Sequence, residues 1–120
     1  MSNMPKPPLQ QTLQQERAAQ AWKDVESTRR NKEYNSLVRG FAAMIQRDGL
    51  GASLVFLKAK GKPEHKFLID HLSAWVTKKL GWQGDLLQTL LTRSTHDYRR
   101  ATAEAIAYLL WLKRFAEAEA

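Results

Sequence analysis

Apolar residues recur at steps of three and four along most of this chain, the spacing that gathers side chains on one face of an α-helix. The pattern predicts six helices, separated by turn formers such as glycine, asparagine and proline. We therefore predict an all-α fold, a compact single-domain bundle of about six helices. The expected helices cover residues 11–27, 32–48, 52–60, 63–80, 85–91 and the stretch that follows residue 94.

The expected helix ends have local chemical reasons. Asn31 can accept a hydrogen bond from a free N–H at the start of the second helix. Gly49, which tolerates a left-handed backbone, ends that helix, and Pro63 suits the first turn of the fourth. Ser94 followed by Asp97 resembles a capping box and predicts where the last helix begins.

Residues 52–60 contain a continuous apolar run, Leu54 to Leu57, whose periodicity does not distinguish a strand from a helix. A lone strand is unstable, and no partner strand is evident elsewhere in the chain. We therefore predict a short buried helix here.

The last helix is apolar on almost every side, which is typical of a helix buried by its neighbours. We therefore place this C-terminal helix at the centre of the bundle. The predicted core draws on four of the helices and consists of Trp22, Phe41, Trp75, Tyr98, Ala105, Tyr108, Trp111, Leu112 and Phe115.

The 120 residues suit one domain, which we expect to span residues 11–120 after a flexible, proline-rich arm at residues 1–10. The arm lacks the apolar segment of a secretory signal, and the longest run without charged or strongly polar residues, 105–112, is too short to cross a bilayer. The absence of cysteine rules out disulfides and thiolate metal sites. We expect a cytoplasmic protein that binds no membrane.

The sequence offers no group of residues suited to catalysis. The histidines match no metal-binding spacing: they are His65, His71 and His96. The acidic residues are scattered, and several have a basic residue one helical turn away, which is typical of solvated surface. Such pairs are Lys66 with Asp70, Arg100 with Glu104, and Lys113 with Glu117. We expect no enzymatic activity, no metal and no cofactor.

A formal net charge of +7 favours an anionic partner such as nucleic acid, although many soluble proteins are equally basic. The densest cluster lies in a connector, where ammonium groups can reach phosphates: Lys58, Lys60, Lys62 and Lys66. Smaller clusters are Arg29, Arg30 and Lys32, and the pair Lys78 and Lys79. Ordinary solvated surface explains the connector lysines equally well and the smaller clusters better.

The last helix also carries a more specific signal. Its run YRRATAEAIAYLLWLKRFAEA, residues 98–118, closely resembles the C-terminal signature of the small-subunit family of type III-B CRISPR (Cmr) effector complexes, whose members are the fifth subunit. The resemblance extends to RAAQAWKDV at residues 17–25, YNSLVRGFAAMIQRDGLGASLVFLKAK at 34–60 and DLLQTLL at 85–91. It covers nearly the whole chain from residue 17.

The resemblance implies a non-catalytic, structural and RNA-binding subunit that acts in antiviral defence. Members of that family stack beside backbone subunits and line the groove where guide and target RNA pair. The implied partners are the backbone and large subunits, neighbouring copies, guide RNA and target RNA, and the isolated chain is expected to be monomeric. The alternatives are a free-standing nucleic-acid-binding protein with a helix-turn-helix, and a small nuclease, which the scattered acids disfavour.

The purified protein is expected to cleave neither RNA nor DNA with any divalent metal, because its acids and histidines are too scattered to hold one. Gel assays with labelled oligonucleotides measure this directly. Metal-dependent cleavage that disappears when a single acidic residue is substituted would contradict the interpretation.

Overall fold

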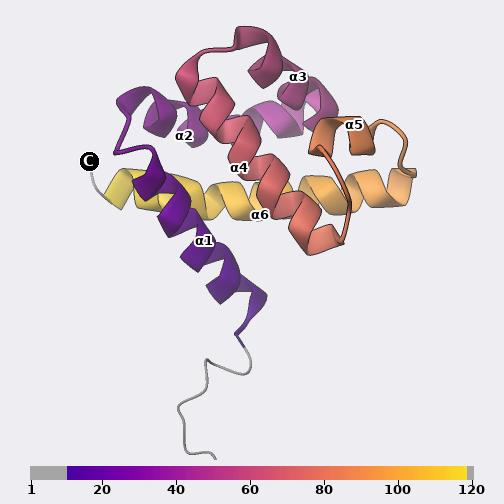
Figure 1. Cartoon of the computed structure of the whole chain (residues 1–120), viewed down its shortest axis with the longest axis horizontal. Helices are drawn as coiled ribbons and strands as arrows, with labels where there is room; N and C mark the ends of the chain where they lie inside the picture. Colours follow the sequence, from indigo (N-terminus) through magenta and orange to yellow (C-terminus); the bar gives the residue numbers. More distant parts are fainter. Residues whose placement is uncertain (1–10, 119–120) are drawn as a thin grey trace, which may run out of the picture.

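A computed structural model of the chain describes residues 11–118 and confirms the all-α bundle of six helices. No strand occurs in this described part of the chain. The expected flexible arm at residues 1–10 lies outside it. The helices are α1 (Leu13–Ser27), α2 (Lys32–Asp48), α3 (Leu50–Lys60), α4 (Pro63–Leu80), α5 (Leu86–Leu90) and α6 (Thr95–Ala118) (Figure 1).

Helix α6 is the centre of the packing. It crosses the whole view of Figure 1, and it packs against α1, α2, α4 and α5. Three alanines on its inner side, Ala101, Ala105 and Ala116, let the neighbouring helices approach closely, while Tyr108 and Leu112 fill the space between them. Each fully buried side chain of that size contributes about 1.5–3 kcal/mol by leaving water.

The predicted helix caps are confirmed. The side-chain oxygen of Asn31 accepts a hydrogen bond from the Tyr34 N–H at 2.8 Å, and the Ser94 hydroxyl accepts one from the Asp97 N–H at 3.1 Å. Pro63 occupies the first turn of α4. The first helix begins with a capping box that was not predicted, in which Thr12 and Gln15 satisfy each other's backbone N–H groups.

A single residue, Gly49, joins α2 to α3, and its φ of +93° is one that a side chain would strain. Helix α3 therefore starts without a side-chain cap of its own. The Tyr98 hydroxyl of α6 supplies the missing acceptor, taking a hydrogen bond from the Gly51 N–H at 2.7 Å. A Cβ on Gly51 would lie 3.2 Å from that hydroxyl, so the small residue allows the contact.

The buried carboxylate of Glu104 links α1 and α4 to α6 through hydrogen bonds. Glu104 of α6 accepts hydrogen bonds from Arg17 Nε at 2.7 Å and Arg17 Nη2 at 2.9 Å, and from Trp75 Nε1 at 2.8 Å. Burial alone would raise the pKa of Glu104, but the hydrogen bonds from Arg17 and Trp75 outweigh it and hold the pKa below its usual range. The expectation that Glu104 is a solvated partner of Arg100 is therefore wrong.

A second carboxylate completes this polar layer. The Tyr108 hydroxyl of α6 donates to Asp24 of α1, and burial together with that hydrogen bond raises the pKa of the hydroxyl, which stays protonated. The Tyr108 ring stacks on Trp75 of α4, with centroids 4.8 Å apart and planes 11° apart. The two stacked rings thus each donate to a different carboxylate, which fixes their positions relative to α1.

The structure corrects part of the predicted core. Phe41, Trp75, Ala105, Tyr108 and Leu112 are buried. Tyr98, Trp111 and Phe115 are only half-buried and pack against the core from its edge, so full burial was wrong for these three. Trp22 is 42% exposed and was wrongly placed in the core.

Trp22 and Trp111 lie at the edge of the core for a geometric reason. Helix α1 packs chiefly on α6, which covers one side of α1 and leaves Trp22 at the margin, edge-on to Phe115 with centroids 5.3 Å apart. The Trp111 indole N–H donates to the exposed Gln14 of α1 at 2.8 Å, which satisfies this polar group at the edge of the bundle.

Replacing Glu104 by alanine should lower the free energy of unfolding by about 2–4 kcal/mol, because Arg17 and the Trp75 N–H lose their partner while buried. Glu117→Ala, an exposed acid on the same helix, is the control and should change it by less than about 0.5 kcal/mol. Urea unfolding followed by circular dichroism measures both. Equal losses for the two variants would contradict the role given to Glu104.

Candidate nucleic-acid interface

The four connector lysines all lie at the surface where α3 ends and α4 begins. Lys58 and Lys60 are in the last turn of α3, where the negative end of the helix dipole favours a cation. Lys62 occupies the position directly before α4, where its side chain makes no capping hydrogen bond. Lys66 follows one turn later. All four side chains are exposed, and the Lys60 ammonium lies 5.8 Å from the centroid of the Phe56 ring.

Helix packing brings a fifth lysine to the same end of the bundle. The first turn of α2 lies beside the first turn of α4, and an open groove of about 470 Å³ runs between them. Lys32 lines the α2 side of this groove, and Glu64 and His65 line the α4 side. We call the resulting patch the lysine surface; its members are Lys32, Lys58, Lys60, Lys62 and Lys66.

The lysines of this surface are available for a ligand. Among residues 11–118, no ion pair engages any of the five. The acids nearest in sequence are Glu33 and Glu64, so positive charge prevails. The groove itself is lined by one lysine, Lys32, and two acids, Glu33 and Glu64, and the other four lysines are exposed in and beside the connector. Exposed ammonium groups of this kind can bind phosphates, and such contacts are insensitive to base sequence.

The neighbouring arginines differ from each other. Both adopt a left-handed backbone in the turn from α1 to α2, with φ of 56° for Arg29 and 59° for Arg30. The Arg30 guanidinium donates to the Phe115 carbonyl at the end of α6 and forms an ion pair with Glu26. Arg30 therefore ties α1 to the end of α6, whereas Arg29 is exposed and lies next to the lysine surface in the chain.

The pair Lys78 and Lys79 lies at the other end of α4, about 25 Å along the helix from Lys62. The Lys79 ammonium forms an ion pair with Glu16 and lies 4.9 Å from the centroid of the Trp75 ring. Lys78 is exposed. The structure thus separates this pair from the other predicted site residues.

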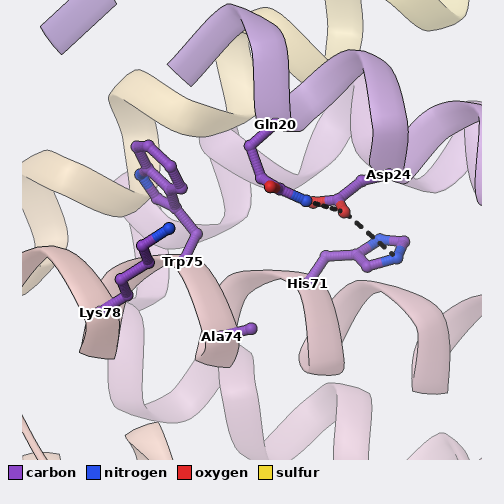
Figure 2. Close-up of a pocket in the computed structure, with 6 residues that line it drawn as sticks. All are labelled: Gln20, Asp24, His71, Ala74, Trp75 and Lys78. Atoms are coloured by element: carbon purple, nitrogen blue, oxygen red, sulfur yellow. Dashed lines mark hydrogen bonds and ion pairs between the residues drawn. The ribbon is translucent and has the colours of Figure 1, made fainter. Parts of the chain in front are cut away.

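A small cavity of about 160 Å³ lies between α1 and α4, and Figure 2 shows its lining. Its carboxylate, Asp24, accepts from the Gln20 amide at 3.0 Å and lies 3.9 Å from His71 Nε2. His71 Nδ1 is 2.8 Å from the Tyr34 hydroxyl. Gln20, Asp24, His71 and Tyr34 are therefore linked by polar contacts, and the exposed Lys78 is the other polar residue of the cavity lining.

The described residues contain no group of three or more histidine, cysteine or acidic side chains placed to hold a metal ion. None of the helices in residues 11–118 is both long enough and apolar enough to cross a membrane. In residues 11–118, neither finding provides a further candidate site beside the lysine surface.

Geometry and charge thus define a class: a small helical bundle with a continuous core and a basic surface at one end. Residues 13–119 match the model of the family described as CRISPR-associated protein (Cas_Cmr5). The chain therefore belongs to the Cmr5 family of CRISPR-associated proteins.

Individual relatives agree with this assignment. The chain is 32% identical over 111 residues to the CRISPR system Cmr subunit Cmr5 of Thermotoga maritima, covering 88% of this chain and 83% of that protein. It is 30% identical over 88 residues to the protein of the same name from Thermus thermophilus, covering 72% and 74%. A crystal structure of a CRISPR-associated Cmr5 family protein from Thermus thermophilus superposes with a TM-score of 0.77 at 28% identity, covering 91% and 97%.

Acidification should destabilise the fold through His71. Burial lowers the pKa of His71, so the folded state binds fewer protons than the unfolded chain below a pH of about 6.5. The free energy of unfolding should therefore fall as the pH drops through that value. Urea titrations from pH 8 to pH 5 should show this fall in the wild type and a smaller one in His71→Gln. His96→Gln, at an exposed position, should behave as wild type; stability that rises on acidification would contradict the argument.

Proposed function

We propose that the chain is a non-catalytic subunit of a CRISPR Cmr complex and that its lysine surface contacts the guide and target RNA. The observation that carries the RNA-binding part is the convergence of five exposed lysines from three helices and a connector at one end of the bundle. The subunit role is supported by the names of the relatives, which are Cmr subunits. The proposed location is the cytoplasm.

The lysine surface suits an RNA held by other subunits better than RNA in free solution. One copy offers only a few phosphate contacts, and nonspecific binding of that kind is typically about 10⁻⁴ to 10⁻⁶ M at physiological salt. Copies stacked along one duplex would present these contacts in register. Each further contact would then be intramolecular, and avidity could exceed the single-copy affinity by a factor of about 10² to 10⁴.

The alternative of a free-standing helix-turn-helix regulator is less well supported. Helix α3 follows α2 after a tight turn, as a recognition helix would. However, its exposed side includes Ala52, Val55 and Ala59, whose side chains cannot form hydrogen bonds with a base edge. Its other side is buried through Leu50, Leu54 and Leu57.

The RNA-binding part is tested by charge reversal in the assembled complex. Lys58, Lys60, Lys62 and Lys66 are replaced together by glutamate, and target RNA affinity is measured over about 50 to 300 mM salt. Loss of four phosphate contacts in each copy should weaken binding and reduce the slope of log K against log salt by about 3 for every copy that contacts the RNA. The bundle should still fold, since all four side chains are exposed.

Two control variants distinguish the effect of losing positive charge at the lysine surface from the effects of substitution itself and of charge reversal elsewhere. Replacement of the same four lysines by arginine keeps the charge and should keep both affinity and slope. Lys23→Glu with Arg47→Glu reverses charge away from the lysine surface and should change the slope little. An unchanged affinity and slope for the fourfold glutamate variant, in an intact complex, would refute the RNA contact.

A further inference from the structure

Helix α6 has a second apolar face that the other helices cover only in part. Ala103 is three and four residues from Ile106 and Ala107, and these are four and three residues from Leu110, so all four share one side of the helix. Leu110 is 44% exposed and Ala103 is exposed, while the two residues between them are half-buried. The opposite side of α6 is the one that packs into the core through Ala101, Ala105, Tyr108 and Leu112.

The outer apolar face of α6 marks a difference between the burial expected for this helix and the burial found. A helix apolar on all sides is expected to be surrounded by other helices. The core covers only one side of α6, and the remaining apolar side chains stay in contact with water. Contiguous exposed apolar surface on a small protein is typical of a site that binds another macromolecule.

The apolar face continues into a groove at the start of α6. This groove is open, has a volume of about 450 Å³, and shares Ala103 with the face. Leu13 of α1, which is 40% exposed, and Leu80 of α4 add apolar walls. The same lining holds three cations and the acid Glu104, and each cation has an ion pair within the chain: Arg17 with Glu104, Lys79 with Glu16 and Arg100 with Asp97.

The charges beside the face are mostly positive. Before the apolar residues come Arg99 and Arg100, and after them come Lys113 and Arg114. Glu117 is the one acid among the residues from 105 to 118. An acidic partner would complement this charge, whereas a two-fold contact of the face with a second copy of itself would bring like charges together.

The geometry also indicates the shape of the partner. From Ala103 to Arg114 the face measures about 17 Å, or about three helical turns. Its two alanines would let a partner backbone approach closely between the larger side chains of Ile106 and Leu110. The face carries no exposed aromatic ring in its middle on which a nucleic-acid base could stack, which disfavours RNA as its occupant.

We propose that this outer face of α6 docks an acidic amphipathic helix of another protein subunit. This proposal rests on the proposed function in one respect, because the partner is expected to be another subunit of the same complex. It adds a protein-binding surface that is separate from the lysine surface.

The test uses the complete chain and the purified remaining Cmr subunits from the same organism. Leu110→Glu is mixed with them, and incorporation is measured by size-exclusion chromatography. A buried charge without a partner should reduce incorporation by about tenfold or more. Val55→Glu, at a 52% exposed position on α3, is the matched control and should incorporate as wild type. Both variants should keep the wild-type circular dichroism spectrum and melting temperature, because both positions are exposed.

A photo-crosslinker placed at position 110 identifies the occupant. The expected product joins this chain to a segment of another protein subunit in which acidic and apolar residues alternate at helical spacing. A product with RNA, or with a second copy of this chain, would overturn the proposal, and so would normal incorporation of Leu110→Glu.

The outcomes also separate this inference from the proposed function. If the fourfold lysine variant retains RNA affinity while Leu110→Glu fails to incorporate, the RNA contact is wrong and the docking face stands. If Leu110→Glu incorporates normally while the lysine variant loses RNA, the docking face is wrong and the RNA contact stands. A wild-type chain that does not join the other subunits at all would refute both.

Discussion

The bundle depends on two carboxylates that hold a pair of stacked aromatic rings. Glu104 accepts from Trp75 and Arg17, Asp24 accepts from Tyr108, and the two rings stack between these hydrogen bonds. The arrangement joins α1, α4 and α6, which are also linked nearer the surface by the Trp111–Gln14 hydrogen bond and the Lys79–Glu16 ion pair. Breaking one such buried hydrogen-bonded pair leaves its partners unsatisfied, and this makes the layer a strong determinant of helix position.

Both of the proposed binding surfaces follow from that arrangement. Because α1 and α4 are fixed on one side of α6, the outer side of α6 remains only partly covered from Ala103 to Leu110. The packing of α4 against α2 brings Lys32 beside the connector lysines at one end of the molecule. Residues 11–118 therefore offer two separate candidate binding surfaces, one charged and one apolar.

The helix boundaries could be predicted from the sequence because their causes are local. The caps at Asn31, Pro63 and Ser94 depend on residues within one turn. For the segment that forms α3, periodicity was ambiguous, and the lack of a partner strand predicted the helix. The pairing of Glu104 with Arg17 could not be predicted in the same way, since the two are 87 residues apart and Arg100 offered a local alternative. The available signal was the position of Glu104 between Ala101, Ala105 and Tyr108 on the most apolar face of the chain, where a lone acid needs a buried partner.

Burial was harder to predict for the aromatic residues. Periodicity places Trp22 on the same side of α1 as Ala21 and Val25, yet only these smaller residues meet α6. The fraction of the α1 surface that is buried depends on how many helices pack on α1, and the local sequence pattern does not contain this information. The arrangement of the basic clusters was equally hard to predict. Their exposure follows from composition, but only the packing of α2 on α4 brings Lys32 to the same end of the bundle as Lys62 and Lys66.

The central claim is that the lysine surface faces RNA within the complex, and lysine footprinting tests it most directly. The complex, assembled with guide RNA, is treated with an acetylating reagent with and without target RNA, and the reactivity of each lysine is measured by mass spectrometry. The account predicts that Lys58, Lys62 and Lys66 become protected when target RNA binds, while the exposed Lys23 keeps its reactivity. Unchanged reactivity at those three lysines, with protection at Lys78 instead, would contradict it.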